Sequence, residues 1–117
     1  MSAENEKISQ IEIHFGDIFI RPFKNELLKH VITNLGHGSY FFAAVIQIIN
    51  GEENLFHSGT YGFGDIYPKM TGERWSLERI IQAYDRYYKN RFNILLPDES
   101  RQTLIKQDRR GSRILPK

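Results

Sequence analysis

Residues 61–69 combine aromatic rings, two closely spaced glycines and an acid, and these residue types suggest a binding function. Glycines two positions apart let the backbone adopt positive φ angles or approach a ligand closely. The rings beside them can stack on a base, on another ring or on a partner side chain. We therefore predict an exposed recognition loop, with the alternative that its rings tuck into the core at the end of a strand. The contact residues would be Tyr61, Phe63, Asp65, Tyr67 and Lys69.

The glycine spacing in this loop excludes two common phosphate sites. The letters GTYGFG follow the pattern G-x-x-G-x-G rather than the dinucleotide fingerprint G-x-G-x-x-G. No G-K-[ST] follows, so the segment is not a P-loop either.

Cations are concentrated in the second half of the chain. Residues 1–60 hold four Lys/Arg against seven Asp/Glu, whereas residues 61–117 hold twelve against seven. Arg79 and Arg86 are seven positions apart and would share one helical face, where Tyr87 could add a stacking surface. Such a face either binds phosphates or is a solvated surface paired with acids such as Glu78 and Asp85. The cations that we predict to contact a partner are Arg74, Arg79, Arg86, Lys89, Arg109, Arg110 and Arg113.

Acid–base chemistry has one candidate set, formed by Asp17, His57 and Asp65, which lie at or near the ends of expected strands. A shared pocket there could tune their pKa values. No G-x-S-x-G motif is present, and the four histidines do not show H-E-x-x-H spacing. We expect no metal site and no cofactor, and we keep a small enzyme with a site near Asp65 and His57 as an alternative function.

Length and composition fit one compact domain. Of the 117 residues, 40% are hydrophobic, 26% charged and 13% aromatic, and none is cysteine. The absence of cysteine excludes disulfides and thiolate sites and fits a reducing compartment. The start, MSAENEKISQ, lacks an apolar signal region. We therefore expect a cytoplasmic protein with no membrane contact.

The first half of the chain alternates between strand and helix signals. Period-two alternation over 8–15, turn residues at Gly16 and Asp17, and a second expected strand at 18–21 predict a hairpin. The spacing of Leu27, Leu28, Val31, Ile32 and Leu35 predicts a helix over 24–35 that ends at Gly36. In residues 40–49 both of the alternating faces of a strand would be apolar, which is typical of a central strand covered on both sides. Asn50 and Gly51 predict a hairpin to a weaker strand at 55–61.

The second half contains a helix from Ser76, which can cap the first turn, with Leu77, Ile80, Ile81, Tyr84 and Tyr88 as its buried stripe. Residues 92–96 form an apolar exit that could add a fifth edge strand. Residues 1–97 would thus form a single α+β domain with a frayed tail at 1–7. Residues 98–117 would be a basic extension, either a short helix or a disordered segment.

Together these patterns predict an α+β fold. We expect a small antiparallel sheet of four or five strands in the order β-β-α-β-β-α, with two helices packed mainly on one face. The predicted function is a small non-catalytic interaction or regulatory protein that recognises a macromolecule, most simply another protein. Its contacts would be the glycine-aromatic loop, the basic-aromatic helix face and the basic tail. A nucleic-acid-binding accessory protein is the main alternative, and the small enzyme with a site near Asp65 and His57 is the second. As for partners, the chain could also form a homo-oligomer.

Overall fold

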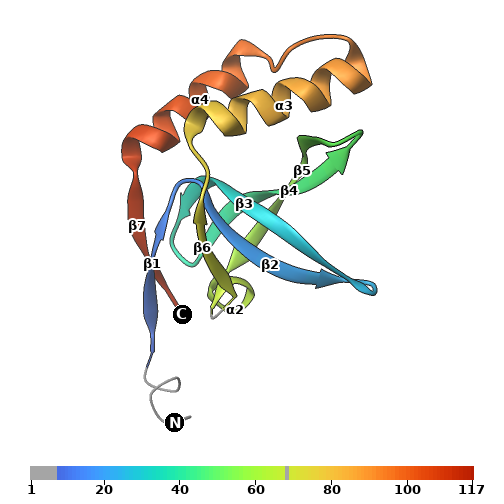
Figure 1. Ribbon diagram of the computed structural model, residues 1–117. Helices are drawn as coiled ribbons and strands as arrows, with labels where there is room; N and C mark the ends of the chain where they lie inside the picture. Colours follow the sequence, from blue (N-terminus) through green and yellow to red (C-terminus); the bar gives the residue numbers. More distant parts are fainter. Residues whose placement is uncertain (1–7, 68) are drawn as a thin grey trace.

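The structure is a computed structural model that describes residues 8–67 and 69–117, apart from the side chains of His57 and Ser58. The predicted frayed tail at 1–7 lies outside the described residues. The fold is mixed α+β, as predicted, with a curled antiparallel sheet below a layer of helices (Figure 1). None of the described helices is long and apolar enough to cross a membrane.

The main sheet has five antiparallel strands in the order β5-β4-β3-β2-β6. Tight turns join its four consecutive strands, so they form a meander. The turn at Asn50 and Gly51, where both residues have positive φ, confirms the predicted hairpin. The strands are β2 (Asp17–Phe23), β3 (Glu26–His37), β4 (Tyr40–Ile49), β5 (Glu52–Gly62) and β6 (Met70–Arg74).

A separate two-stranded ribbon joins the two ends of the described chain. In it β1 (Gln10–His14) pairs antiparallel with β7 (Ser112–Pro116). The predicted hairpin between residues 8–15 and 18–21 is therefore wrong. Gly16, at φ +89°, turns the chain from the ribbon into the main sheet, and its N–H donates to the Ile32 carbonyl while its own carbonyl accepts from the Trp75 N–H.

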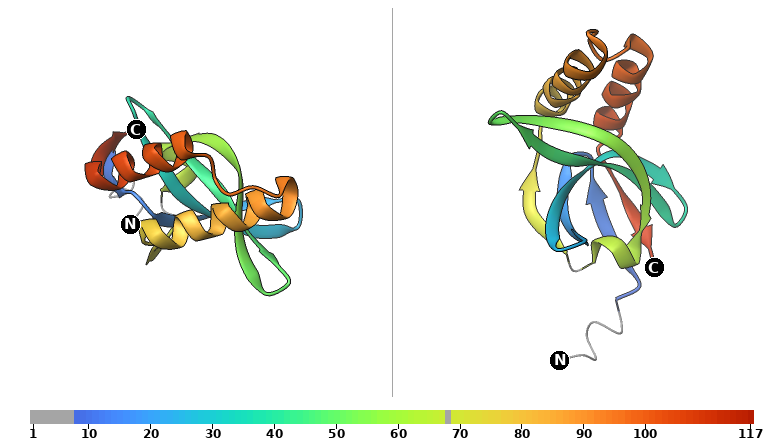
Figure 2. Two further views of the ribbon diagram at one scale, coloured as in Figure 1. Left: turned by 90° about the horizontal axis from the view of Figure 1, so that it is seen from above. Right: turned by 90° about the vertical axis from the view of Figure 1, so that its right-hand side faces the viewer.

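Three helices complete the fold: α2 (Phe63–Ile66), α3 (Leu77–Phe92) and α4 (Asp98–Arg110). Seen from above, α3 and α4 run side by side in opposite directions across the strands (Figure 2). The Ser76 hydroxyl accepts the N–H of Arg79, which confirms the predicted start of α3. Asn93, in the left-handed conformation, ends α3.

The sheet carries apolar side chains on both faces, because both faces are covered. One cluster lies between the sheet and α3 and α4, and the other is closed by β1, β7 and α2. Neighbouring residues of β2, Ile18 and Phe19, belong to different clusters, as do Val31 and Ile32 of β3. The buried stripe of α3 packs as predicted, with Ile80 fully buried and its neighbours partly so.

The predicted helix at 24–35 is wrong, because these residues form most of β3. Their apolar spacing resembles a helix only because β3 is buried on both faces in its second half, and register shifts after Ile32 interrupt the period-two pattern. The consecutive Val31, Ile32 and Thr33 are β-branched and favour a strand. The order β-β-α-β-β-α is thereby corrected to five consecutive strands, then α2, β6, α3, α4 and β7.

The proposed fifth strand at 92–96 is also wrong, because Phe92 ends α3 and the next residues connect it to α4. The fifth strand of the sheet is β6, on the opposite side next to β2. Residues 98–117 hold α4 and β7, and the two elements pack on β3 and on β1 respectively.

Candidate functional site

The segment predicted as a recognition loop forms the end of β5 and the short helix α2. Tyr61 is half-buried and packs edge-on against Phe19, with ring centroids 5.5 Å apart. Phe63 packs on the second core cluster and stacks on Tyr67 at 5.4 Å. Asp65 accepts the Gly62 N–H at 2.9 Å, which starts α2. The rings thus help to cover one face of the sheet, which is the alternative arrangement considered above, whereas Lys69 is exposed.

Three of the predicted contact arginines pair with acids of the same chain. Arg74 binds the buried carboxylate of Asp17, with Nε and Oδ1 2.8 Å apart. Arg79 makes a two-pronged contact with Glu53, at 2.9 and 2.6 Å, and its guanidinium lies 4.2 Å from the centre of the Trp75 ring. The hydrogen bond lowers the pKa of Glu53 and raises that of Arg79.

Arg86 belongs to the same contact between α3 and the β4–β5 hairpin. Its guanidinium donates to the Glu53 carbonyl at 3.1 Å and lies 3.5 Å from a carboxylate oxygen of Glu52. All three arginines remain partly exposed, so these pairs add modestly to stability. They also occupy much of the predicted cationic face.

Two of the arginines in the predicted basic tail, Arg110 and Arg113, hold the turn between β3 and β4. Arg113 donates to the carbonyls of Leu35, Gly38 and Tyr40 at 2.6, 3.0 and 2.7 Å. Arg110 donates to the Gly36 carbonyl at 2.6 Å. Burial, with the nearby Arg110 as a second cause, lowers the pKa of Arg113.

Among the described cations that we predicted as contacts, Lys69, Lys89 and Arg109 are exposed and make no ion pair or side-chain hydrogen bond. They are the members of the set that a partner could bind without breaking an internal contact.

The acid–base set is not brought together in the described part of the molecule. Asp17, at the first residue of β2, faces Arg74, whereas Asp65 faces Arg21, four residues further along β2. The side chain of His57 lies outside the described residues. Across the described chain, no three His, Asp or Glu side chains are grouped so as to hold a metal ion.

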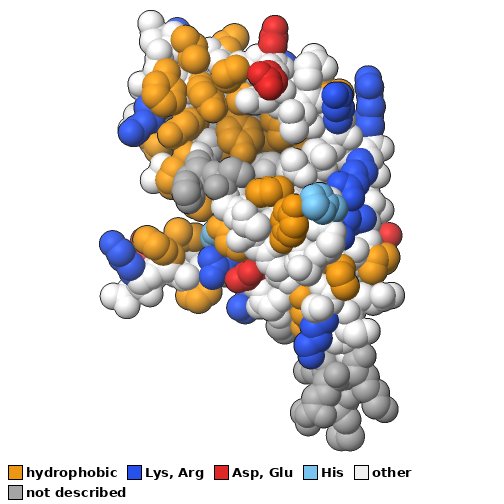
Figure 3. Space-filling model, turned by 180° about the vertical axis from the view of Figure 1, so that it is seen from behind, with side chains coloured by type: hydrophobic (Ala, Val, Ile, Leu, Met, Phe, Trp, Pro, Cys, Tyr) orange, Lys and Arg blue, Asp and Glu red, His pale blue; other side chains and the backbone are white. Residues whose placement is uncertain are grey.

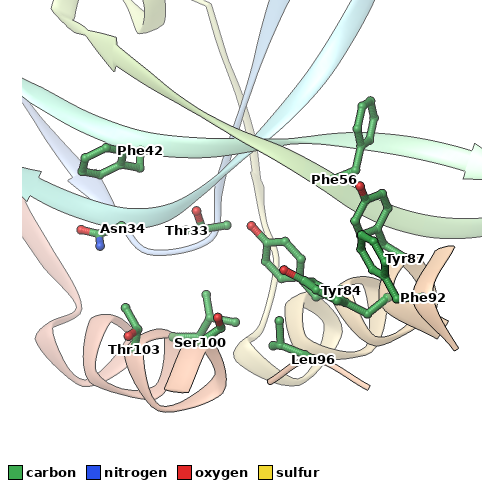
Figure 4. Close-up of a pocket in the computed structure, with 12 residues that line it drawn as sticks. Thr33, Asn34, Phe42, Phe56, Tyr84, Tyr87, Phe92, Leu96, Ser100 and Thr103 are labelled. Atoms are coloured by element: carbon green, nitrogen blue, oxygen red, sulfur yellow. The ribbon is translucent and has the colours of Figure 1, made fainter. Parts of the chain in front are cut away.

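A cavity of about 540 Å³ lies between the sheet and the two long helices, and we take it as the candidate functional site (Figure 4). Pockets that bind small-molecule ligands are commonly of this size. Five elements, β3, β4, β5, α3 and α4, and the α3–α4 connection supply its walls, and no lining side chain is charged. The lining residues are Thr33, Asn34, Phe42, Phe56, Tyr84, Tyr87, Tyr88, Phe92, Leu96, Ser100, Thr103 and Leu104.

One end of the cavity is aromatic. Phe56 of β5 stacks on Tyr87 of α3 with centroids 6.0 Å apart and 26° between the planes. Phe92 meets Tyr87 nearly edge-on at 6.3 Å and Tyr88 at 5.6 Å. Offset and edge-on contacts of this kind hold rings in fixed positions, so this end is a preformed wall.

The other end of the cavity is polar but uncharged. Figure 4 shows Asn34 and Thr33 of β3 facing Ser100 and Thr103 of α4, with Phe42 beyond Asn34. Tyr84 directs its hydroxyl towards Thr33 from the aromatic side.

The ionisable side chains of the lining are tyrosines. Burial raises the pKa of the Tyr84 hydroxyl to about 12, against the smaller opposing effect of its hydrogen bond with Thr33. Tyr84 therefore stays protonated at neutral pH and cannot serve as a base. In this state the Tyr84 hydroxyl takes part in hydrogen bonds.

Asp85 fixes the connection on which the cavity depends. Its Oδ1 accepts the Leu96 N–H at 2.8 Å and an N–H of Arg101 at 2.9 Å. One carboxylate thus ties α3 to the residues that begin α4. On the opposite side, the side-chain amide oxygen Oε1 of Gln107 accepts the Leu35 N–H at 2.8 Å, which ties α4 to β3.

Exposed apolar side chains adjoin the cavity. Phe92 is 54% exposed, and Ile94 and Leu95, in the stretch between the lining residues Phe92 and Leu96, are 49% and 61% exposed. Figure 3 shows hydrophobic side chains gathered over the helical layer on the face opposite to that of Figure 1.

Sequence reasoning found part of this site. It placed Tyr84 and Tyr88 on the inner stripe of α3 and Tyr87 as a stacking surface. It missed the residues that other elements contribute, because nothing local shows that they converge. The i, i+3, i+4 spacing of Ser100, Thr103 and Leu104 was the available signal for the α4 wall. Comparisons of the chain with protein-family models, curated proteins and solved structures found no match.

Proposed function

We propose that this chain is a non-catalytic interaction protein that binds another protein by receiving an apolar segment of it in the aromatic cavity. The observation that carries this proposal is the uncharged cavity with Phe92, Ile94 and Leu95 exposed beside it. A cytoplasmic location stays a prediction.

The exposed side chains favour a macromolecular partner over a small metabolite. A small ligand inside the cavity would leave Ile94 and Leu95 in water, whereas a bound protein segment would cover the cavity and its surroundings together. Clustered exposed apolar groups next to a pocket are typical of protein-binding sites, and buried aromatic anchors often dominate such interfaces.

One of the exposed cations, Lys89, fits a polar rim around this contact. Lys89 lies one helical turn before Phe92 on α3 and is not engaged elsewhere in the described chain. Rim charges of this kind steer association more than they add affinity. The predicted contributions of Tyr61, Phe63 and the 61–69 segment to partner binding stay predictions.

Two features weigh against the other functions considered. Nucleic-acid binding needs free cations beside stacking rings, whereas Arg79 and Arg86 are paired with Glu53 and Glu52 and the cavity lining has no cation. Catalysis needs an acid, base or nucleophile held in a working geometry, and the lining offers only hydroxyl, phenol and amide groups.

Selection from a random 12-residue peptide library tests the proposal. We expect enriched peptides to bind the wild-type chain and to lose at least about tenfold in affinity, roughly 1.4 kcal/mol, against Thr103→Phe, which fills the cavity from α4. The matched control is Gln102→Phe, an exposed position of α4 outside the lining. Failure to enrich any peptide, or equal binding to both variants, would overturn the proposal.

A further inference from the structure

We infer that the group received by the cavity is an uncharged phenol, presented by the partner as a tyrosine side chain. This inference rests on the proposed function and adds the chemistry of what is recognised. It depends on the division of the cavity into an aromatic end and a neutral polar end.

The lack of charge in the lining disfavours charged ligand groups. A carboxylate, phosphate or ammonium moved from water into this cavity would lose its hydration without meeting an opposite charge, which is strongly unfavourable. The aromatic wall of Phe56, Tyr87 and Phe92 instead offers ring faces and edges to a neutral ring.

The polar end can both donate and accept hydrogen bonds. The Asn34 Oδ1 already accepts the Gly36 N–H at 2.9 Å, so the Asn34 amide N–H groups are what remains to donate. The Thr103 hydroxyl donates to the Glu99 carbonyl at 3.0 Å, so towards the cavity it acts as an acceptor. Ser100 has no hydrogen-bond partner for its hydroxyl within the described chain and can take either role.

A phenol matches this arrangement better than a purely apolar ring does. Its ring would lie against the aromatic wall, and its hydroxyl would both donate and accept at the end lined by Asn34, Ser100 and Thr103. A phenylalanine side chain would leave the Asn34 amide N–H groups and the Ser100 hydroxyl without partners once water is excluded. The structure therefore predicts discrimination for a ring that ends in a hydroxyl.

The test uses p-cresol, the side chain of tyrosine, with toluene as its matched apolar analogue. Titrations followed by backbone amide NMR should show saturable shifts at Asn34, Ser100 and Thr103. Binding of p-cresol should be about fivefold tighter than that of toluene, as one net hydrogen bond implies. Ser100→Ala should reduce this preference without weakening toluene, and Gln102→Ala, outside the lining, should change neither.

Two charged analogues complete the series. Both p-methylbenzoate and 4-methylbenzyl-trimethylammonium should bind at least tenfold more weakly than p-cresol. Tighter binding of the ammonium compound would identify a cation–π cage instead, and tighter binding of toluene would identify an apolar pocket. Either result, or shifts that map outside the cavity, would overturn the inference.

The inference and the proposed function can fail separately. Library peptides that depend on the open cavity but keep their affinity after Tyr→Phe substitution would retain the protein-binding function and reject the phenol. Binding of p-cresol without any peptide would retain the phenol site and reject the protein partner.

Discussion

Replacement of Gly16 by alanine should be among the most damaging single changes in this chain. A Cβ added at Gly16 would lie 2.2 Å from the Trp75 carbonyl oxygen, whereas real Cβ atoms essentially never come within 3.0 Å of such an atom. Gly16 also has φ +89°, which side-chain-bearing residues rarely adopt. The backbone cannot move aside easily, because Gly16 makes backbone hydrogen bonds with both Ile32 and Trp75.

The expected cost is the sum of three effects. The positive φ costs about 1–2 kcal/mol. Relief of the overlap costs about 1–3 kcal/mol, as in other overpacked sites. The weakened bond from the Trp75 N–H to the Gly16 carbonyl, beside a side chain only 3% exposed, adds about 1 kcal/mol. The total is about 4 kcal/mol, a large part of the stability of a small domain.

Gly72→Ala is the matched control. Its φ of +86° is nearly the same, but no atom lies within 4 Å of its added Cβ. This variant should therefore lose only the backbone contribution of about 1–2 kcal/mol. The difference between the two variants isolates the contact with Trp75.

Urea unfolding followed by fluorescence measures both variants directly, because Trp75 is the chain's single tryptophan and is buried beside the mutated site. With an m-value of about 1.3 kcal/mol/M, Gly72→Ala should lower the midpoint by about 1 M and Gly16→Ala by about 3 M. Equal shifts for the two variants would refute the close approach of Gly16 to Trp75.

Three further outcomes are expected from urea unfolding. Arg113→Lys should lower the free energy of unfolding by about 1–2 kcal/mol, because a lysine ammonium cannot reproduce the planar guanidinium that donates to three carbonyls of the turn. An equal loss of stability in Arg109→Lys, at an exposed position, would contradict this reasoning. Burial lowers the pKa of His30 in the folded state. As the pH falls, His30 is therefore protonated in the unfolded chain before it is protonated in the folded one. The stability that neutral His30 provides should thus be complete above about pH 6.5 and fall as the pH drops below it, and the slope should flatten in His30→Phe. Asp85→Ala should cost about 2 kcal/mol and speed hydrogen exchange at the Leu96 amide, since that N–H loses its acceptor; unchanged exchange would count against this role.

The sequence predicted the elements whose signals are local. The capping serine at 76 and the apolar stripe after it identify α3, and Asn50 with Gly51 identifies the β4–β5 turn. The strand predicted at 40–49, with apolar residues on both of its faces, is β4, and it lies between β5 and β3 within the sheet. In each case neighbouring residues determine the conformation.

What the sequence did not predict depends on partners far along the chain. The apolar spacing in β3 fits a helix until both of its faces are known to be covered. The pairing of β1 with β7, like the pairing of Arg113 with the β3–β4 turn, has no local signature. The cavity has the same origin, since residues from 33 to 104 form its walls.

The β1–β7 ribbon determines how the molecule would respond to tension. Gln10 and Pro116 are opposite each other at its outer end, so a pull on these two residues peels the strands apart pair by pair instead of sliding them past one another. Each step loads only the next pair of hydrogen bonds, which is a weak mechanical arrangement. Peeling would soon draw Leu115 and Ile13 out of the second core cluster, so tension at this point would first uncover the face of the sheet that lies opposite α3 and α4.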